Sequence, residues 1–153
     1  MAATSYLRDT SQPRTPVTVG GALKAGFGLQ KLHVGMTREE CRAVFGDPNE
    51  VRSFKDGTFF QYLRLGFDLD FELGSKAKRL FFYRSGVQRH TEQCNVSFRG
   101  ISFGSSADEI KVALGAPSET GRVGKKQWML FNSGIQFDLD SRGRTEVIIL
   151  FRP

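Results

Sequence analysis

Residues 33–50 read HVGMTREECRAVFGDPNE, and residues 102–119 read SFGSSADEIKVALGAPSE. A shift of about 69 positions places five residues of the first stretch on identical residues of the second: Gly35 on Gly104, Glu40 on Glu109, Gly46 on Gly115, Pro48 on Pro117 and Glu50 on Glu119. Recurrence at a fixed spacing is the sequence signature of a repeated structural unit. We therefore expect the chain to contain two copies of one module.

Each copy carries the signals that begin and end a short helix. Thr37 and Ser106 can accept a hydrogen bond in the first turn, and the glutamate three residues later can bond back, which is a capping box. A glycine followed two positions later by a proline then ends each helix. Apolar residues at helical spacing form one stripe on each helix, namely Cys41, Val44 and Phe45 in the first and Ile110 and Leu114 in the second.

After each helix the apolar residues alternate with polar ones, which is typical of strands. Asp56-Gly57 predicts a hairpin turn, and GFDLDFE at residues 66–72 gives the clearest alternation. We expect residues 21–32 to form a short helix interrupted by glycines, and residues 121–126 to form a loose arm. The predicted strands span residues 51–54, 58–63, 67–72 and 79–84 in the first copy and 127–132, 134–140 and 146–152 in the second.

The sequence therefore predicts an α+β fold of two tandem repeats, each a short capped helix packed on a four-stranded antiparallel sheet. The expected divisions are a flexible N-terminal arm at 1–20, a first repeat at 21–85, a linker at 86–95 and a second repeat at 96–153. Residues 80–83 and 147–151 are apolar on both faces of their strands, so the second face also requires cover. We expect the two sheets to pack on one another; the alternative is a partner protein that covers them.

Composition limits the function classes. The chain has 153 residues, 39% of them apolar, with 14 phenylalanines and a net charge of +6, values that fit a globular protein with a buried core. Two cysteines, Cys41 and Cys94, do not make a disulfide framework. No N-terminal signal segment or apolar run of membrane-spanning length is present. We expect a cytoplasmic protein that does not bind a membrane.

The capped-helix motif resembles a known family signature. Val34-Gly35-Met36-Thr37-x-x-Glu40 followed by Phe45-Gly46-x-Pro48 is similar to the "GMT-x-x-E-V…LG-x-P" pattern of the SmpA/OmlA small outer-membrane lipoproteins and of the repeats in β-lactamase inhibitor protein. The second copy, from Phe103 to Pro117, is similar too. The resemblance implies a curved, continuous sheet whose concave side grips another protein, in proteins that act by binding.

The sequence points to a protein-binding module, of the inhibitor or immunity type, that blocks a partner through a sheet surface. Large aromatic side chains concentrate the energy of protein interfaces, while charges mainly set approach and register. The predicted aromatic anchors are Phe59, Tyr62, Phe81, Tyr83 and Trp128. The predicted orienting charges are Asp68, Asp70, Asp138 and Asp140.

Chemistry is weakly indicated, and we predict no enzyme, no cofactor and no metal site. A nucleophile–base pair would require Cys94 and His90, four residues apart in the predicted linker, and we interpret His90 as a flexible polar linker residue. The alternating carboxylates of residues 68–72 could bind a hard cation, but the sequence offers no loop-borne ligands to complete such a site. We interpret them as a solvated strand face.

Two other functions stay open. Single-stranded nucleic acid could bind basic side chains that lie beside aromatic ones; the groups concerned are Arg122, Lys125 and Lys126 near Trp128, and Lys76, Lys78 and Arg79 near Phe81 and Tyr83. A small-molecule or lipid pocket could also lie between the two expected sheets.

Overall fold

The fold is α+β, with two helices and an eight-stranded antiparallel sheet among the residues that the structure describes. The computed structural model describes residues 17–18, 24–27, 30–73, 76–94 and 96–151. The predicted N-terminal arm therefore lies mostly outside the described residues. The strands of the sheet, in spatial order, are β4 (Glu50–Phe54), β5 (Gly57–Tyr62), β6 (Phe67–Glu72), β7 (Arg79–Tyr83), β12 (Thr145–Phe151), β11 (Ile135–Leu139), β10 (Lys126–Phe131) and β9 (Glu119–Val123).

The helices begin and end where the sequence predicts. In α2 (Arg38–Phe45) the hydroxyl of Thr37 accepts from the Glu40 amide at 3.1 Å, and the Glu40 carboxylate accepts from the Thr37 amide at 3.0 Å. In α3 (Ala107–Leu114) Ser106 and Glu109 repeat this reciprocal pair at 3.2 and 3.0 Å. Both capping boxes are confirmed, and each copy therefore begins its helix by the same local chemistry.

The two halves are joined strand to strand. β7 pairs antiparallel with β12, and this contact places Tyr83 opposite Val147, Phe81 opposite Ile149 and Arg79 opposite Phe151. The four strands on either side follow in mirrored order, β4 to β7 and β9 to β12. The expectation that two separate sheets pack face to face is wrong, because the apolar β7 and β12 lie side by side at the centre of one sheet.

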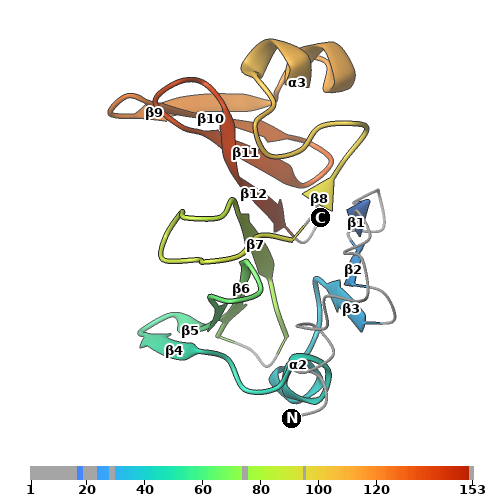
Figure 1. The fold of residues 1–153 in the computed structure, drawn as a ribbon, viewed down its shortest axis with the longest axis vertical. Coiled ribbons are helices and arrows are strands. Elements are labelled where there is room, and N and C mark those ends of the chain that lie inside the picture. The colour runs from blue at the N-terminus through green and yellow to red at the C-terminus, as the bar shows by residue number, and fades with distance from the viewer. Residues whose placement is uncertain (1–16, 19–23, 28–29, 74–75, 95, 152–153) are drawn as a thin grey trace.

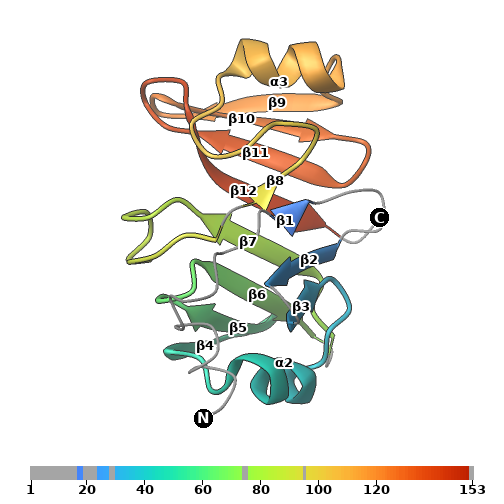
Figure 2. The same cartoon turned by 45° about the vertical axis from the view of Figure 1, so that its right-hand side comes forward.

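One face of the sheet carries the main core. Residues at alternate positions, such as Phe60, Leu69 and Phe82 in the first half and Phe137 and Ile148 in the second, belong to one continuous apolar cluster. That cluster also contains the inward residues of both helices: Cys41, Phe45 and Ile110. Figure 2 shows α3 beside one end of the sheet and α2 beside the other. The apolar stripes predicted on the helices therefore cover the same face.

Short strands cover the middle of this face between the helices. The hairpin of β2 (Lys24–Phe27) and β3 (Gln30–His33) and the parallel pair of β1 (Val17–Thr18) with β8 (Val96–Ser97) lie in front of the sheet in Figure 2. The predicted helix at 21–32 is wrong, because residues 24–27 and 30–33 pair as strands. The predicted loose arm at 121–126 is also wrong, because Gly121–Val123 belong to β9.

Candidate binding face of the sheet

The opposite face of the sheet points away from both helices, and we call it the open face. Its side chains are those that alternate with the core residues on each strand. Cross-strand pairing places them in rows. One row runs through Asp68, Phe81, Ile149, Gln136 and Leu130; a second runs through Tyr83, Val147, Asp138 and Trp128; a third runs through Phe59, Asp70, Arg79 and Phe151.

Aromatic rings follow one another across the first half of this face. The ring centroids of Phe54 and Phe59 are 5.7 Å apart, as are those of Phe59 and Phe81, and Phe81 stacks on Tyr83 at 6.3 Å. Phe54 is 57% exposed and Phe59 and Phe81 are half-buried, whereas Tyr83 is buried beneath the linker. Of the predicted anchors in this half, Phe59 and Phe81 are therefore accessible to a partner.

The second half contributes a similar apolar surface. Trp128, Leu130 and Phe151 are half-buried side chains on the open face. The ring of Trp128 lies over Gly121 of the neighbouring strand so closely that a side chain at residue 121 would collide with it. Trp128 occupies the position that Phe59 holds in the first copy, which the repeat spacing gives directly. The sequence pattern does not single out Leu130 and Phe151, because each is one apolar residue within an ordinary strand.

Tyr62 does not belong to the open face. It lies in the core beside Phe45 and Phe67, and its hydroxyl donates to the carbonyl oxygen of Gly46 at 2.9 Å. The prediction that Tyr62 is an exposed anchor is wrong because it alternates with Gln61 and Leu63 and so points to the helix side. Burial raises the pKa of its hydroxyl, and the nearby Cys41 adds to this effect.

The first two aspartates are buried, not solvated. Asp70 is 3% exposed and accepts from Nε of Arg79 at 2.7 Å, while the same guanidinium lies over the Phe81 ring at 5.1 Å. Asp68 is 2% exposed and accepts from Nε2 of Gln61 at 3.2 Å. The interpretation of these carboxylates as a solvated stripe is wrong, because cationic and amide partners on the neighbouring strands satisfy them.

Asp138 and Asp140 have different surroundings. Asp138 accepts from Nε2 of Gln136 at 2.7 Å, and partial burial raises its pKa. Asp140 directly follows β11, where partial burial would raise its pKa. Hydrogen bonds from the amides of Arg144 and Arg142 and from the guanidinium of Arg84 outweigh that effect, so its pKa is lowered. Asp138 therefore lies among the open-face residues, whereas Asp140 mainly holds a turn.

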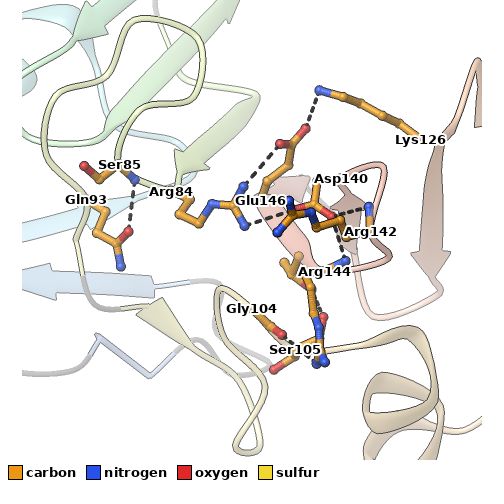
Figure 3. Close-up of polar contacts among 11 residues, drawn as sticks. Arg84, Ser85, Gln93, Gly104, Ser105, Lys126, Asp140, Arg142, Arg144 and Glu146 are labelled. Atoms are coloured by element: carbon orange, nitrogen blue, oxygen red, sulfur yellow. Dashed lines mark hydrogen bonds and ion pairs between the residues drawn. The ribbon is translucent and has the colours of Figure 1, made fainter.

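Arg84 connects the two halves at this end of the sheet. Figure 3 shows its guanidinium between Asp140 and Glu146, at 3.1 Å from Oδ2 of Asp140 and 3.7 Å from Oε1 of Glu146. Nζ of Lys126 bonds the other oxygen of Glu146 at 2.8 Å. These charges are satisfied within the chain, so the end of the open face is held together by ion pairs between β7, β10, β11 and β12.

His90 is not a flexible linker residue, and that interpretation is wrong. Its ring is 0% exposed, lies flat on Tyr83 at a centroid distance of 4.0 Å and places Nε2 2.7 Å from Oδ1 of Asp68. The residue was missed because the polar composition around it is typical of a solvated loop. Within the described residues, no group of three or more His, Cys, Asp or Glu side chains is arranged to hold a metal ion.

A surface pocket of about 280 Å³ lies away from the open face, at the end of α3. Its lining includes Leu114, Phe131 and Ser133. The first copy has larger residues at the corresponding positions, Phe45, Tyr62 and Leu65. The alternative of a small-molecule or lipid pocket between two sheets gains no support, because β4–β7 and β9–β12 form one sheet. No described helix combines the length and the apolar character needed to cross a membrane.

Comparison with known proteins establishes the fold only. No protein-family model and no curated protein matches the chain, so the resemblance to the SmpA/OmlA lipoproteins and β-lactamase inhibitor protein gains no support there. A DUF4309 family protein, YjgB, from Bacillus subtilis is similar in structure, with a TM-score of 0.62 and 14% identity over 87% of this chain and 90% of that one.

A second solved structure, an extracellular protein containing a SCP domain from Bacillus anthracis, has a TM-score of 0.51 and 12% identity over 77% of this chain. The matched region is 43% of that protein, so this chain spans less than half of its length. At such identities the likeness extends to the α+β architecture and not to activity or partner.

Proposed function

We propose that this chain is a non-enzymatic protein-binding module that holds a partner protein against the open face of its sheet. The proposed role is that of an inhibitor or immunity protein, which acts by covering a functional surface of its partner. It rests mainly on one observation: Phe59, Phe81 and Trp128 are large aromatic side chains, incompletely buried, on a face that neither helix covers.

Aromatic side chains in this setting favour a protein partner. Contiguous apolar surface on a soluble chain commonly marks an interaction site, and Trp and Tyr are enriched among residues that dominate binding energy. Here the aromatic side chains come from both halves, Phe59 and Phe81 from the first and Trp128 from the second. The pairing of β7 with β12 joins the two halves of the face and places Phe81 opposite Ile149 at its centre. A partner placed over this centre would contact both repeats at once.

The carboxylates next to the aromatic side chains have little capacity to form ion pairs with a partner, because most of them are already paired within the chain. Asp70 is already paired with Arg79 and Asp68 with His90. We therefore propose that Phe59, Phe81 and Trp128 provide the main contact, and that Asp138, the less enclosed carboxylate beside Trp128, sets orientation. The buried residues of the open face hold its aromatic side chains in place; they are Asp68, Asp70 and Tyr83. Asp140 holds the turn that follows β11.

The test compares two variants of the full chain as immobilised bait in extracts of the native host. Replacing Phe59 and Trp128 together by alanine removes one anchor from each half and should abolish capture of the partner. Val112→Ala is the matched control, because Val112 is an 88% exposed apolar residue on α3, away from the open face. It should capture the partner as the unmodified chain does.

Three results would contradict the proposal. Equal capture by the double-alanine variant would show that the partner binds elsewhere. Capture that disappears after nuclease treatment or with rising salt would instead favour single-stranded nucleic acid, since such binding depends steeply on ionic strength. Turnover of a captured small molecule would exclude a purely binding role. The cytoplasmic location predicted from the sequence stays a prediction.

A further inference from the structure

The pocket at the end of α3 is formed by three segments of the second repeat. The loop after β8 contributes Phe98 and Arg99, α3 contributes Leu114, and the turn after β10 contributes Asn132 and Ser133. In Figures 1 and 2 these three segments lie toward the same side of the second repeat. The volume is about 280 Å³. An apolar cavity of about 150 Å³ can already hold benzene, so this pocket has room for one ring with a short polar group.

The first repeat fills the equivalent place with larger side chains. The matched pairs are Phe45 and Leu114, Tyr62 and Phe131, and Leu65 and Ser133. Phe45, Tyr62 and Leu65 are all buried in the core. In the second repeat Leu114 is only half-buried and Ser133 is exposed. The pocket is therefore a feature of the second repeat alone, and it arises from side chains rather than from the path of the shared backbone.

The apolar walls of the pocket are held by the core. Phe98 and Phe131 are 8% and 6% exposed and belong to the main apolar cluster, and Leu114 packs against that cluster. Walls fixed in this way are largely formed before a ligand arrives, as is usual for small-molecule sites. A ring placed against Leu114 and Phe131 would bury apolar surface on both sides, which favours binding.

The remaining lining is polar and able to donate hydrogen bonds. Cζ of Arg99 lies 5.4 Å from the centroid of the Phe98 ring. Among the described residues, no carboxylate pairs with Arg99, and no protein group bonds the side chains of Asn132 and Ser133. A guanidinium presents donors in a geometry that matches a carboxylate, and the amide and hydroxyl can add further donors. The polar side of the pocket therefore suits an anionic oxygen pair.

A tight turn holds Arg99 at the edge of the pocket. The amide and carbonyl of Phe98 bond the carbonyl and amide of Ile101 at 2.8 and 2.9 Å, and Arg99 and Gly100 between them have φ values of 52° and 82°. Both central residues of this turn thus lie in the left-handed region, where glycine and asparagine are the common choices. Arginine is an uncommon residue at such a position, and the paired bonds on either side fix its backbone there.

The helix end limits where an anion can lie. α3 ends at Leu114, and the carbonyl groups at a helix C-terminus carry partial negative charge. A carboxylate is therefore disfavoured against the helix and favoured at Arg99. The apolar part of the ligand then faces Leu114 and Phe131, which carry no charge.

From this arrangement we propose that the pocket binds a small organic carboxylate with a single apolar ring, the ring against Leu114 and Phe131 and the carboxylate at Arg99. The pocket lies on the helix side of the second repeat, away from the open face. The inference therefore stands independently of the proposed function, and binding at the two places can be measured separately.

The test is an NMR titration of the free, full-length chain with three probes. Phenylacetate carries the ring and the charge, 2-phenylacetamide carries the ring alone, and acetate carries the charge alone. We expect saturable shifts in the amides of residues 98–100 and 131–134 with phenylacetate, at a dissociation constant of about 1 mM or lower for a ligand of this size. The neutral amide should bind about fivefold more weakly, the scale of one ion pair that is open to solvent. Acetate should not saturate these shifts.

Two results of the titration would overturn the proposal. One is the absence of saturable shifts at about 10 mM phenylacetate, well above the constant expected for such a ligand. The other is equal affinity for phenylacetate and 2-phenylacetamide, which would show that Arg99 does not recognise the charge.

A substitution that copies the first repeat tests the apolar wall. Leu114→Phe introduces the ring that Phe45 supplies in the first repeat and should abolish binding of phenylacetate. Val112→Phe is the matched control, because it adds the same ring to the same helix at a side chain that is 88% exposed. It should bind phenylacetate as the unmodified chain does. Full binding by a folded L114F variant would contradict the proposal.

Variants of Arg99 test the polar side without changing the core. Arg99→Gln should weaken phenylacetate binding about fivefold and leave binding of the neutral amide unchanged, whereas Arg99→Lys keeps the charge and should retain most of the affinity. Arg142→Gln removes a charge from the exposed turn after β11, at the other end of that strand, and should have little effect. Equal losses from R99Q and R142Q would show that net charge, and not this pocket, attracts the carboxylate.

Discussion

At the scale of single residues, a comparison of Tyr62 with Phe131 shows how one hydroxyl group can contribute to the stability of the fold. Both are core residues at equivalent positions of the two copies, but only Tyr62 can donate to the carbonyl that ends its helix, at 2.9 Å. In Tyr62→Phe, the Gly46 carbonyl loses this partner, and we expect the free energy of unfolding to fall by about 1 kcal/mol. Urea denaturation measures the change.

The reverse substitution is the control for Tyr62. Phe131→Tyr places a hydroxyl beside the pocket that Leu114 and Ser133 leave open, so it should cost little stability. If Tyr62→Phe instead left stability unchanged and reduced capture of a partner, Tyr62 would be an interface residue and its assignment to the core would be incorrect.

Asp138 should lower the stability of the folded chain by an amount that depends on pH. Burial raises its pKa in the folded chain, with the charge of Glu146 adding to the effect. The folded state therefore binds a proton more readily than the unfolded state, and ionised Asp138 destabilises the fold above its folded pKa. Asp138→Asn should stabilise the chain at neutral pH, and the gain should shrink as pH falls and native Asp138 becomes protonated.

Thermal unfolding at several pH values measures this difference. Asp56→Asn is a suitable control, since Asp56 is an exposed carboxylate in the β4–β5 turn, and no comparable pH-dependent gain is expected there. A gain from Asp138→Asn that stayed constant from neutral to acid pH would show that burial of the charge is not its cause.

At the scale of elements, the pairing of β7 with β12 joins the two repeats into one sheet, and Arg84 stabilises this contact. Replacing Arg84 by methionine keeps much of the aliphatic length but leaves Asp140 and Glu146 without their shared cation. We expect a loss of about 1–3 kcal/mol, because partly buried carboxylates lose a charged partner.

The matched control for Arg84 is Lys78→Met, which breaks an exposed pair with Glu72. Exposed pairs contribute roughly 0–1 kcal/mol, so this variant should unfold close to the unmodified chain in urea. Equal losses in the free energy of unfolding from both substitutions would indicate that the Arg84 ion pairs do not specifically stabilise the contact between β7 and β12.

At the scale of the whole molecule, the two repeats should unfold together. One sheet and one apolar cluster run through both copies, so neither half can lose its strands without exposing the core of the other. We predict a single transition in which fluorescence of Trp128, in the second repeat, and far-UV circular dichroism change at the same urea concentration. Separated midpoints would show that the repeats are independent folding units.

The sequence predicted the parts of the fold that local chemistry determines. The capping residues around Thr37 and Ser106, and the alternation of residues 67–72, depend on neighbours along the chain, and the structure confirms them. The joining of β7 to β12 depends on contacts between residues more than sixty positions apart. Its apolar strands were recognised, but two stacked sheets and one continuous sheet bury such strands equally well in a single sequence.

The candidate site was predictable to a similar degree. Strand periodicity identified Phe59, Phe81 and Trp128 as members of one face, but it did not show which face the helices cover, and Tyr62 was assigned to the wrong side. The burial of Asp68 and His90 could not be predicted, because it depends on a polar segment folding back over the sheet. Composition alone indicates solvent exposure for such a segment.

The pairing of β7 with β12 has a consequence for how such a chain could arise. Two free copies of the ancestral module would associate through this same edge, as a symmetric dimer whose abundance depends on concentration. Fusion through the linker makes the association intramolecular and thereby permanent. Each half of such a fusion would be free to diverge by itself, which would account for different residues at matching places, such as Asp68 and Gln136 or Tyr62 and Phe131.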